Sequence, residues 1–265
     1  MDNRPIGVYD SGIGGLTGLR ELRRLLPGED FVFFADTGRM PYGPRPQEEL
    51  CRIARQDMDF LAGFDVKVIL AACGTISSAA HAVLAGYPIP AFGVVDTAIR
   101  AMAEVEGDGP LGILATAASI ESGQFTDALR ALCPGREVIG LPCPEFAPMI
   151  ESGHIDPEDP VLIDAVMRTV APIRDVPFSA VLLGCTHYGV IEESLRRALP
   201  GVPMLSASAC GAQAVRDYLV SRDLTGGAGT ARFYISRDPK DFDAFATRYL
   251  EMGTVHAEQV PVMEL

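Results

Sequence analysis

The chain has 265 residues, 48% of them hydrophobic, and a formal net charge of −13. This length allows one large domain or two ordinary domains with hydrophobic cores. The acidic balance opposes binding to nucleic-acid phosphates, and the sequence has no basic stripe. No apolar run is long enough for a membrane span, and no signal-peptide pattern follows Met1. We therefore expect a cytoplasmic globular protein with no nucleic-acid or membrane partner.

The predicted elements alternate along the chain. Short apolar runs predict strands at 6–9, 31–35, 66–71, 91–94, 111–115, 137–141, 180–183, 203–205 and 232–235. Amphipathic stretches predict helices at 15–26, 48–62, 78–85, 122–132, 160–172, 192–199 and 241–252. Alternation of helices with continuously apolar strands is typical of an α/β fold with mostly parallel sheets flanked by helices.

One segment of the sequence is echoed later in the chain. Residues 68–75 read VILAACGT and residues 181–186 read VLLGCT, so an apolar strand is followed twice by cysteine and threonine. Two similar segments, each with a cysteine at the end of a strand, predict two domains that face each other. Ligands of open α/β sheets bind at these tips.

Six cysteines and two lysines limit the cofactor chemistry. No cysteine pair has C-x-x-C spacing and only four histidines are present, so we expect no metal site. Thiols remain reduced in the cytoplasm. Lys67 begins a buried-looking strand and Lys240 lies in a polar turn, which argues against a Schiff base with pyridoxal phosphate. We therefore expect no cofactor.

Cys73 is the first candidate catalytic residue. It follows a strand and precedes Ser77 and Ser78, which resemble helix-capping residues. A thiol at a helix N-terminus has a lowered pKa and is more reactive. The alternative interpretation is a buried structural cysteine, because cysteine is among the most buried residue types.

Cys185 is the second candidate and gives a more specific signal. It lies in the sequence Gly184-Cys185-Thr186-His187-Tyr188 at another strand tip. A histidine two residues away can exchange a proton with the thiol or with a substrate. The alternative is a strand end that carries an ordinary core histidine.

A glycine-rich turn follows the first strand. Asp10 stands at the strand tip and the sequence continues Ser-Gly-Ile-Gly-Gly, with Thr17 in place of the last glycine of a dinucleotide fingerprint. Such a turn offers backbone N–H groups to an anion such as a carboxylate. The alternative is a tight turn whose glycines serve backbone geometry alone.

Weaker signals come from three other places. In the loop after Asp36, Tyr42 offers a hydroxyl and Gly43 an N–H group to a ligand. Thr116 and Ser119 follow a further strand tip, where simple helix capping is the more common role. Glu151 lies near a predicted helix end, where an acidic residue is usually solvated, so spacing alone does not select it.

The doubled cysteine favours one reaction class. Inversion of a stereocentre needs a base on one face of the carbon and an acid on the other, and two thiols can exchange these roles. A cysteine protease or acyltransferase needs one thiol beside a base and an oxyanion hole. The pair therefore favours a two-base racemase or epimerase.

The order of the motifs resembles that of the glutamate racemases, in the aspartate/glutamate racemase superfamily. The similar motifs are DSGIGGLT at 10–17, PYG at 41–43, GCTHY at 184–188, FY at 233–234 and DP at 238–239. The resemblance covers nearly the whole chain. It implies two facing, pseudo-twofold-related α/β domains with the active site in the cleft between them. The first would comprise residues 1–96 and 207–265, and the second residues 97–206.

The resemblance also implies roles for the site residues. Cys73 and Cys185 would be the two acid/base thiols. Asp10 would assist Cys73, and His187, supported by Glu151, would assist Cys185. Substrate binding would fall to Ser11, Pro41, Tyr42, Gly43, Gly74, Thr75, Thr116, Ser119 and Thr186. The implied activity is cofactor-independent interconversion of L- and D-glutamate for peptidoglycan synthesis, by an isomerase that is commonly a homodimer.

The chain departs from the family pattern at three places. Gly74 stands where the family usually has asparagine, Ser119 stands where threonine is usual, and residues 206–210 lack the acidic residues common there. We also expect no activation by a nucleotide precursor, because the associated N-terminal extension is missing. The departures leave two alternatives, a racemase of the same fold for aspartate or a hydantoin, and a non-catalytic small-molecule binding protein.

Overall fold

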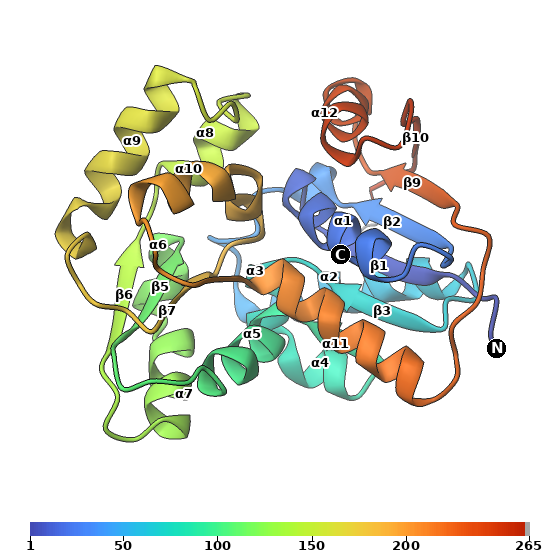
Figure 1. The fold of residues 1–265 in the computed structure, drawn as a ribbon. Helices are drawn as coiled ribbons and strands as arrows, with labels where there is room; N and C mark the ends of the chain where they lie inside the picture. Colours follow the sequence, from blue (N-terminus) through green and yellow to red (C-terminus); the bar gives the residue numbers. More distant parts are fainter. Residues whose placement is uncertain (263–265) are drawn as a thin grey trace.

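The computed structural model describes residues 1–262 and contains two parallel β-sheets flanked by helices (Figure 1). The larger sheet has the order β10-β9-β2-β1-β3-β4 and the smaller the order β6-β5-β7-β8. The larger sheet comprises β1 (Ile6–Asp10), β2 (Phe31–Ala35), β3 (Val68–Ala71), β4 (Ala91–Gly93), β9 (Ala231–Ile235) and β10 (Ala257–Gln259). The smaller sheet comprises β5 (Leu111–Ala115), β6 (Val138–Pro142), β7 (Ala180–Leu183) and β8 (Met204–Ser206). The predicted α/β class is confirmed.

Helices cover both sheets. Around the larger sheet lie α1 (Leu16–Leu25), α2 (Gln47–Ala62), α3 (Gly74–Ala79), α4 (His81–Ala85) and α12 (Lys240–Leu250). Around the smaller sheet lie α6 (Ala117–Glu121), α7 (Gln124–Leu132), α8 (Phe146–Glu151), α9 (Pro160–Val170) and α10 (Glu192–Ala198). We call each sheet with its surrounding helices one half of the molecule. Helices α5 (Val94–Ala103) and α11 (Ala207–Ser221) pack against each other where the two halves join. Within residues 1–262, no helix has the length and apolarity needed to cross a bilayer.

The two sheets repeat one topology. The order β2-β1-β3-β4 in the larger sheet corresponds to β6-β5-β7-β8 in the smaller. Strands β3 and β7 are therefore equivalent, and Cys73 and Cys185 each stand two residues beyond the end of their strand. Helices α5 and α11 likewise follow the equivalent strands β4 and β8. The echo in the sequence thus marks a repeated structural unit.

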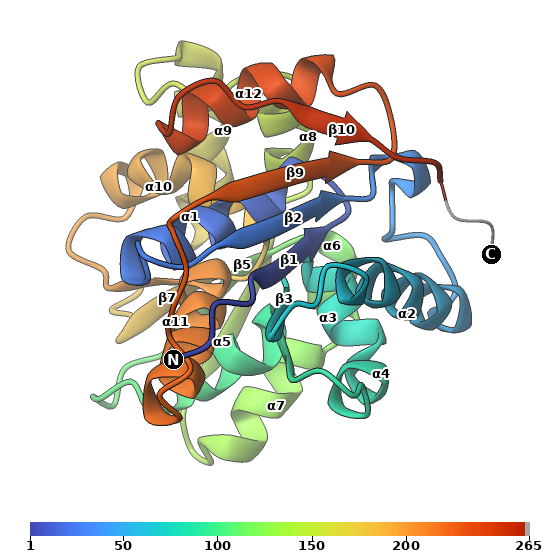
Figure 2. The same ribbon diagram turned by 90° about the vertical axis from the view of Figure 1, so that its right-hand side faces the viewer.

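The central strands are buried on both faces. All five residues of β1 and of β2 are buried because α1, α11 and α12 cover one face of the sheet while α2, α3 and α4 cover the other (Figure 2). In the parallel register Tyr9 pairs with Phe34 and with Ala71. The carboxyl ends of β1, β2 and β3 therefore meet at one edge of the sheet.

Some local predictions were wrong. Instead of one helix at 78–85, the chain forms α3 and α4, and α3 begins directly after Cys73. Ser77 does not cap this helix, because its Oγ accepts a hydrogen bond of 2.9 Å from the Val95 N–H in the first turn of α5. Helix α11 was not predicted. Its small residues allow close packing, since a Cβ on Gly211 would lie 2.9 Å from Leu70 Cδ1.

Candidate active site

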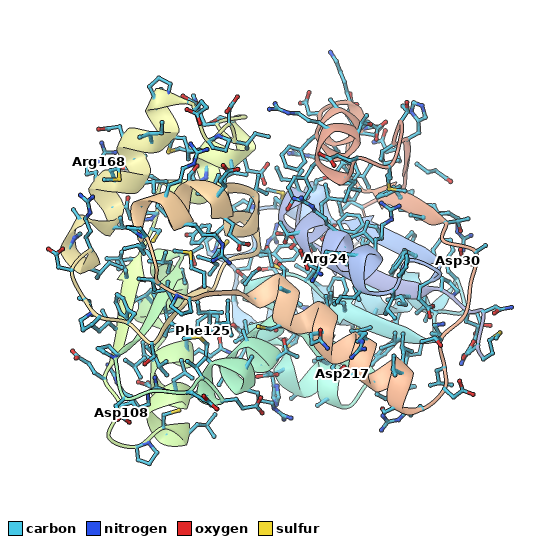
Figure 3. The ribbon with its side chains drawn as sticks, in the orientation of Figure 1. Arg24, Asp30, Asp108, Phe125, Arg168 and Asp217 are labelled. Atoms are coloured by element: carbon cyan, nitrogen blue, oxygen red, sulfur yellow. The ribbon has the colours of Figure 1, made fainter. Side chains whose placement is uncertain are left out.

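The tips of β3 and β7 face each other directly. A Cβ built on Gly74, the residue after Cys73, would lie 3.5 Å from the carbonyl oxygen of Gly184, the residue before Cys185. Beneath Gly184 packs the ring of Phe125 from α7, labelled in Figure 3. The fold therefore brings together two cysteines that are far apart in the sequence.

Asp10 connects the two sides of this junction. It is 1% exposed and accepts hydrogen bonds from the Gly12 N–H at 2.9 Å, from Ser11 Oγ at 3.1 Å and from Thr186 Oγ1 at 3.2 Å. Burial raises the pKa of Asp10 to about 6, against the opposing effects of the positive charge on His187 and of these hydrogen bonds. A carboxyl group with this pKa can both accept and release a proton near neutral pH.

Cys73 lies next to this carboxyl group and is almost fully buried. Its Sγ is 3.7 Å from Ser11 Oγ. Burial raises the pKa of the Cys73 thiol to about 12 and the charge of Asp10 adds to the effect, while N–H groups of Ile76 and Ser11 oppose it. The prediction of a lowered pKa at the helix start was wrong, because desolvation outweighs the helix N-terminus. Cys73 is therefore held as a protonated thiol.

Cys185 has a different partner. Its Sγ lies 3.8 Å from His187 Nδ1, and His187 Nε2 lies 2.6 Å from Glu151 Oε1. Burial alone would lower the pKa of His187, but the hydrogen bonds with Cys185 and Glu151 raise it well above its usual value. The charged, imidazolium form of His187 therefore lies directly beside the Cys185 sulfur. Glu151, which spacing alone did not select, is thus part of the site.

The glycine-rich turn fits closely against this site. A Cβ on Gly14 would lie 2.6 Å from both His187 Nδ1 and Thr186 Oγ1, and a Cβ on Gly15 would lie 2.4 Å from Asp10 Cβ. Real Cβ atoms do not approach other atoms so closely. Glycine is therefore required at 14 by close packing between the two halves and at 15 by close packing against Asp10 of the same half.

The other predicted residues lie around this junction. Thr116 and Ser119 follow β5, the strand beside β7, and their hydroxyl oxygens are 2.9 Å apart at the start of α6. Thr75 is half-buried in the first turn of α3, and Pro41 and Gly43 are exposed on the loop after β2.

Tyr42 is placed differently from its prediction. It is 2% exposed, and its hydroxyl lies 2.5 Å from Asp36 Oδ2 and 3.2 Å from Asp57 Oδ2. The hydroxyl is therefore engaged in the protein interior and is not offered to a ligand. Sequence reasoning missed Asp57, a partner of this hydroxyl, and Arg39, which donates to both Asp36 and Asp57. The sequence feature that could have indicated these buried contacts is Asp36, because it is a polar residue directly after an apolar strand, as Asp10 is.

An open groove also separates the halves, with a volume of about 1340 Å³. Its lining includes Arg24 of α1 and Asp217 of α11 (Figure 3). Neither of the two candidate cysteines nor His187 lines it. This groove is therefore separate from the cysteine site.

Replacement of Glu151 by glutamine is expected to lower the pKa of His187, because the carboxylate that stabilises the imidazolium is lost. NMR titration of the imidazole measures this change. Because folding raises the His187 pKa, the interaction stabilises the fold below about pH 6.5 and is lost as pH rises through the raised value. Asp164→Asn, which changes an exposed carboxylate of α9, is the control and should leave the titration unchanged. An unshifted His187 in Glu151→Gln would contradict this assignment.

Known proteins share both the sequence and the fold. Residues 34–215 match the family described as Asp/Glu/Hydantoin racemase. A glutamate racemase of Thermoanaerobacter pseudethanolicus is 34% identical over 248 residues, 91% of each chain. The structure of glutamate racemase RacE1 from Bacillus anthracis aligns with a TM-score of 0.89 at 28% identity, over 99% of both chains. That of glutamate racemase from Francisella tularensis in complex with D-glutamate aligns with a TM-score of 0.86 at 32% identity, also over 99% of both chains.

These similarities extend over nearly the whole chain and agree with the repeated topology and with the paired cysteines at equivalent strand tips. The chain therefore belongs to the Asp/Glu/Hydantoin racemase family.

Proposed function

We propose that the protein is an isomerase that interconverts L- and D-glutamate by a two-base mechanism without a cofactor, supplying D-glutamate for peptidoglycan synthesis. The observation that carries this proposal is the meeting of two cysteines at equivalent, facing strand tips. The named relatives, which are glutamate racemases, favour glutamate over aspartate or a hydantoin.

In the proposed reaction the α-carbon of glutamate lies between Cys73 and Cys185. The thiolate on one side removes the α-proton, and the electron pair of the broken C–H bond moves into the carboxylate as an enediolate. The thiol on the other side then donates its proton to the opposite face of the carbon. The site finishes with the thiol and thiolate exchanged, so the reverse reaction uses the same groups in opposite roles.

The two thiols have different surroundings. Burial favours the protonated form of Cys73, whereas Cys185 lies beside the imidazolium of His187. When Cys73 acts as the base, Asp10, with its pKa of about 6, can take the proton from the Cys73 thiol. The cationic ammonium group of a bound amino acid would oppose the effect of burial and favour a thiolate at Cys73.

Substrate binding in this proposal uses local donors, because the net charge of −13 opposes an anionic substrate. The hydroxyl groups and backbone N–H groups around the two cysteines would hold the carboxylates and stabilise the enediolate. We assign this role to Ser11, Tyr42, Gly43, Gly74, Thr75, Thr116, Ser119 and Thr186, while Pro41, which has neither a hydroxyl nor an N–H group, would bind the substrate by van der Waals contact. Tyr42 would contribute through its backbone, since its hydroxyl is engaged with Asp36 and Asp57.

Both lysines are poorly placed for a Schiff base at this site. Lys67 precedes β3, at the opposite end of the strand from Cys73, and its Nζ lies 2.5 Å from Glu29 Oε2 in the interior. Lys240 begins α12. This supports the cofactor-independent mechanism that we propose.

We further propose two domains, residues 1–96 with 207–265 and residues 97–206, with the active site in the cleft between them. Each proposed domain contains one of the two sheets, which supports the division. We also propose that the enzyme is cytoplasmic and works as a homodimer, as its resemblance to the family implies.

Racemisation of L-glutamate followed by circular dichroism tests the proposed function. In D₂O the product is expected to carry deuterium at Cα while the remaining substrate stays protiated at early times, because separate bases act on the two faces. L-Aspartate and hydantoins are the matched alternative substrates. A higher kcat/KM for one of these, or binding of glutamate without turnover, would overturn the proposal.

Gly74→Asn is expected to lower the KM for glutamate about threefold to tenfold and to change kcat less. The new Cβ would stand at ordinary contact distance from Gly184 O, and the added amide can hydrogen-bond the substrate. Initial rates with both enantiomers measure the effect. Gly28→Asn, at a turn where a new Cβ meets nothing within 4 Å, is the control. An increased KM in Gly74→Asn would show that glycine is needed for substrate access.

A further inference from the structure

We propose that the buried cluster of Asp36, Arg39, Tyr42 and Asp57 is a positioning device that holds residues 40–43 at the substrate cleft. Asp36, Arg39 and Asp57 are then positioning residues for the reaction. The inference rests on the proposed function in one respect, because it takes residues 41–43 to contact the substrate.

Asp36 fixes the cluster to the sheet edge that carries Asp10. Its backbone N–H donates to the Asp10 carbonyl oxygen at 2.9 Å. Its Oδ1 accepts from Ser236 Oγ at 2.9 Å, and its Oδ2 accepts from Arg39 Nε and from the Tyr42 hydroxyl, both at 2.5 Å. Asp36 thus joins the tips of β1, β2 and β9 to the loop.

Asp57 fixes the cluster to helix α2. Its Oδ1 accepts from Arg39 Nη2 at 2.6 Å, and Arg39 Nη1 donates to Gln56 Oε1 at 2.5 Å. Burial and the charge of Asp36 raise the pKa of Asp57 well above its usual value. The Tyr42 hydroxyl has one proton, which it donates to Asp36, so a protonated Asp57 can donate to the Tyr42 oxygen. Asp36 and Arg39 then form a neutral pair, and each proton has an acceptor.

Tyr42 is the anchor of the loop. It is 2% exposed, whereas its neighbours Pro41 and Gly43 are both exposed. One buried side chain therefore holds a segment in which Pro41 and Gly43 are exposed and Met40 is half-buried. Arg45 braces the same segment from outside, because its guanidinium donates to the carbonyl oxygens of Arg39 and Pro41.

The cluster also adjoins the Cys73 side of the site. Tyr42 and Cys73 belong to the same buried apolar cluster, together with Ile76 of α3. A shift of the Tyr42 ring would therefore move the loop relative to the thiol. Misplacement of a substrate contact by about 1 Å is enough to reduce catalysis substantially.

Tyr42→Phe tests the inference, because it removes the hydroxyl and keeps the ring. We expect the KM for glutamate to rise about tenfold with kcat within threefold, and faster amide hydrogen exchange confined to residues 38–46. Tyr87→Phe is the matched control, since the Tyr87 hydroxyl also donates to an aspartate of α2, Asp59 at 2.7 Å, but at the surface. The control should change neither quantity.

Two variants at Asp57 add a rescue test. Asp57→Asn keeps a neutral group that accepts from Arg39 and donates to Tyr42, so its KM should stay within threefold of the wild-type value. Asp57→Leu keeps a similar volume without these hydrogen bonds and should reproduce the effect of Tyr42→Phe. A KM that rises equally in both variants would overturn the inference.

The outcomes separate this inference from the proposed function. If the wild-type protein does not racemise glutamate, the proposed function fails, whereas hydrogen exchange still tests whether Tyr42 holds the loop. Wild-type KM in Tyr42→Phe, or exchange that rises throughout the molecule, would overturn the positioning role.

Discussion

Replacement of either Cys73 or Cys185 by alanine is expected to reduce racemisation by about 10³-fold or more in both directions. Each turnover requires proton removal by one thiolate and proton donation by the other thiol, so the loss of either group stops the complete cycle. A positioned acid or base commonly contributes 10²- to 10⁴-fold, and here one residue serves in both roles. Circular dichroism with L- and with D-glutamate measures the loss.

The other cysteines provide matched controls for this experiment. Cys51 lies in α2 and Cys210 lies in α11, and all six cysteines of the chain are free thiols. Cys51→Ala and Cys210→Ala should retain kcat within about threefold, because neither thiol contacts the paired strand tips. Full racemisation by Cys73→Ala or Cys185→Ala would exclude the two-base mechanism.

The second large effect is expected from Gly14→Ala, which should lower kcat/KM by about 10²-fold. The added methyl group would lie 2.6 Å from both His187 Nδ1 and Thr186 Oγ1, so one of these side chains or the turn itself must move. His187 assists Cys185 in the proposed mechanism, and Thr186 donates to Asp10. A displacement of about 1 Å at such groups is sufficient for a loss of this size.

Gly28→Ala is the control for Gly14→Ala, because its new Cβ has nothing within 4 Å. NMR titration of His187 in the Gly14→Ala protein shows whether the imidazole has lost its contact with Cys185, in which case its pKa should fall. Retention of wild-type kcat/KM in Gly14→Ala would show that the turn can open without cost to catalysis.

The sequence by itself determined the alternation of elements and the place of the two cysteines. The strands predicted at 31–35, 111–115 and 180–183 have the observed bounds, because short apolar runs between polar turns are fully buried in parallel sheets. A cysteine directly beyond such a run must stand at the strand tip. The echo between the two halves therefore identified the pair without any knowledge of their contacts.

The sequence was less informative about helices made of small residues. Helix α11 was missed because Ala, Ser and Gly residues give little amphipathic contrast, while its partners α1 and α5 explain its small side chains. Strand β10, at the edge of the larger sheet, was missed because the half-buried and exposed residues of this short segment show no apolar run.

Only the tertiary structure decided the electrostatics of the site. Cys73 directly precedes a helix, a position that suggests a lowered thiol pKa. Burial beside Asp10 raises the pKa instead. Ser77 caps a helix that begins 17 residues later, and Tyr42 turns its hydroxyl towards Asp57 rather than outward. Desolvation and hydrogen bonding depend on which distant segments pack together, and local sequence patterns carry little of that information.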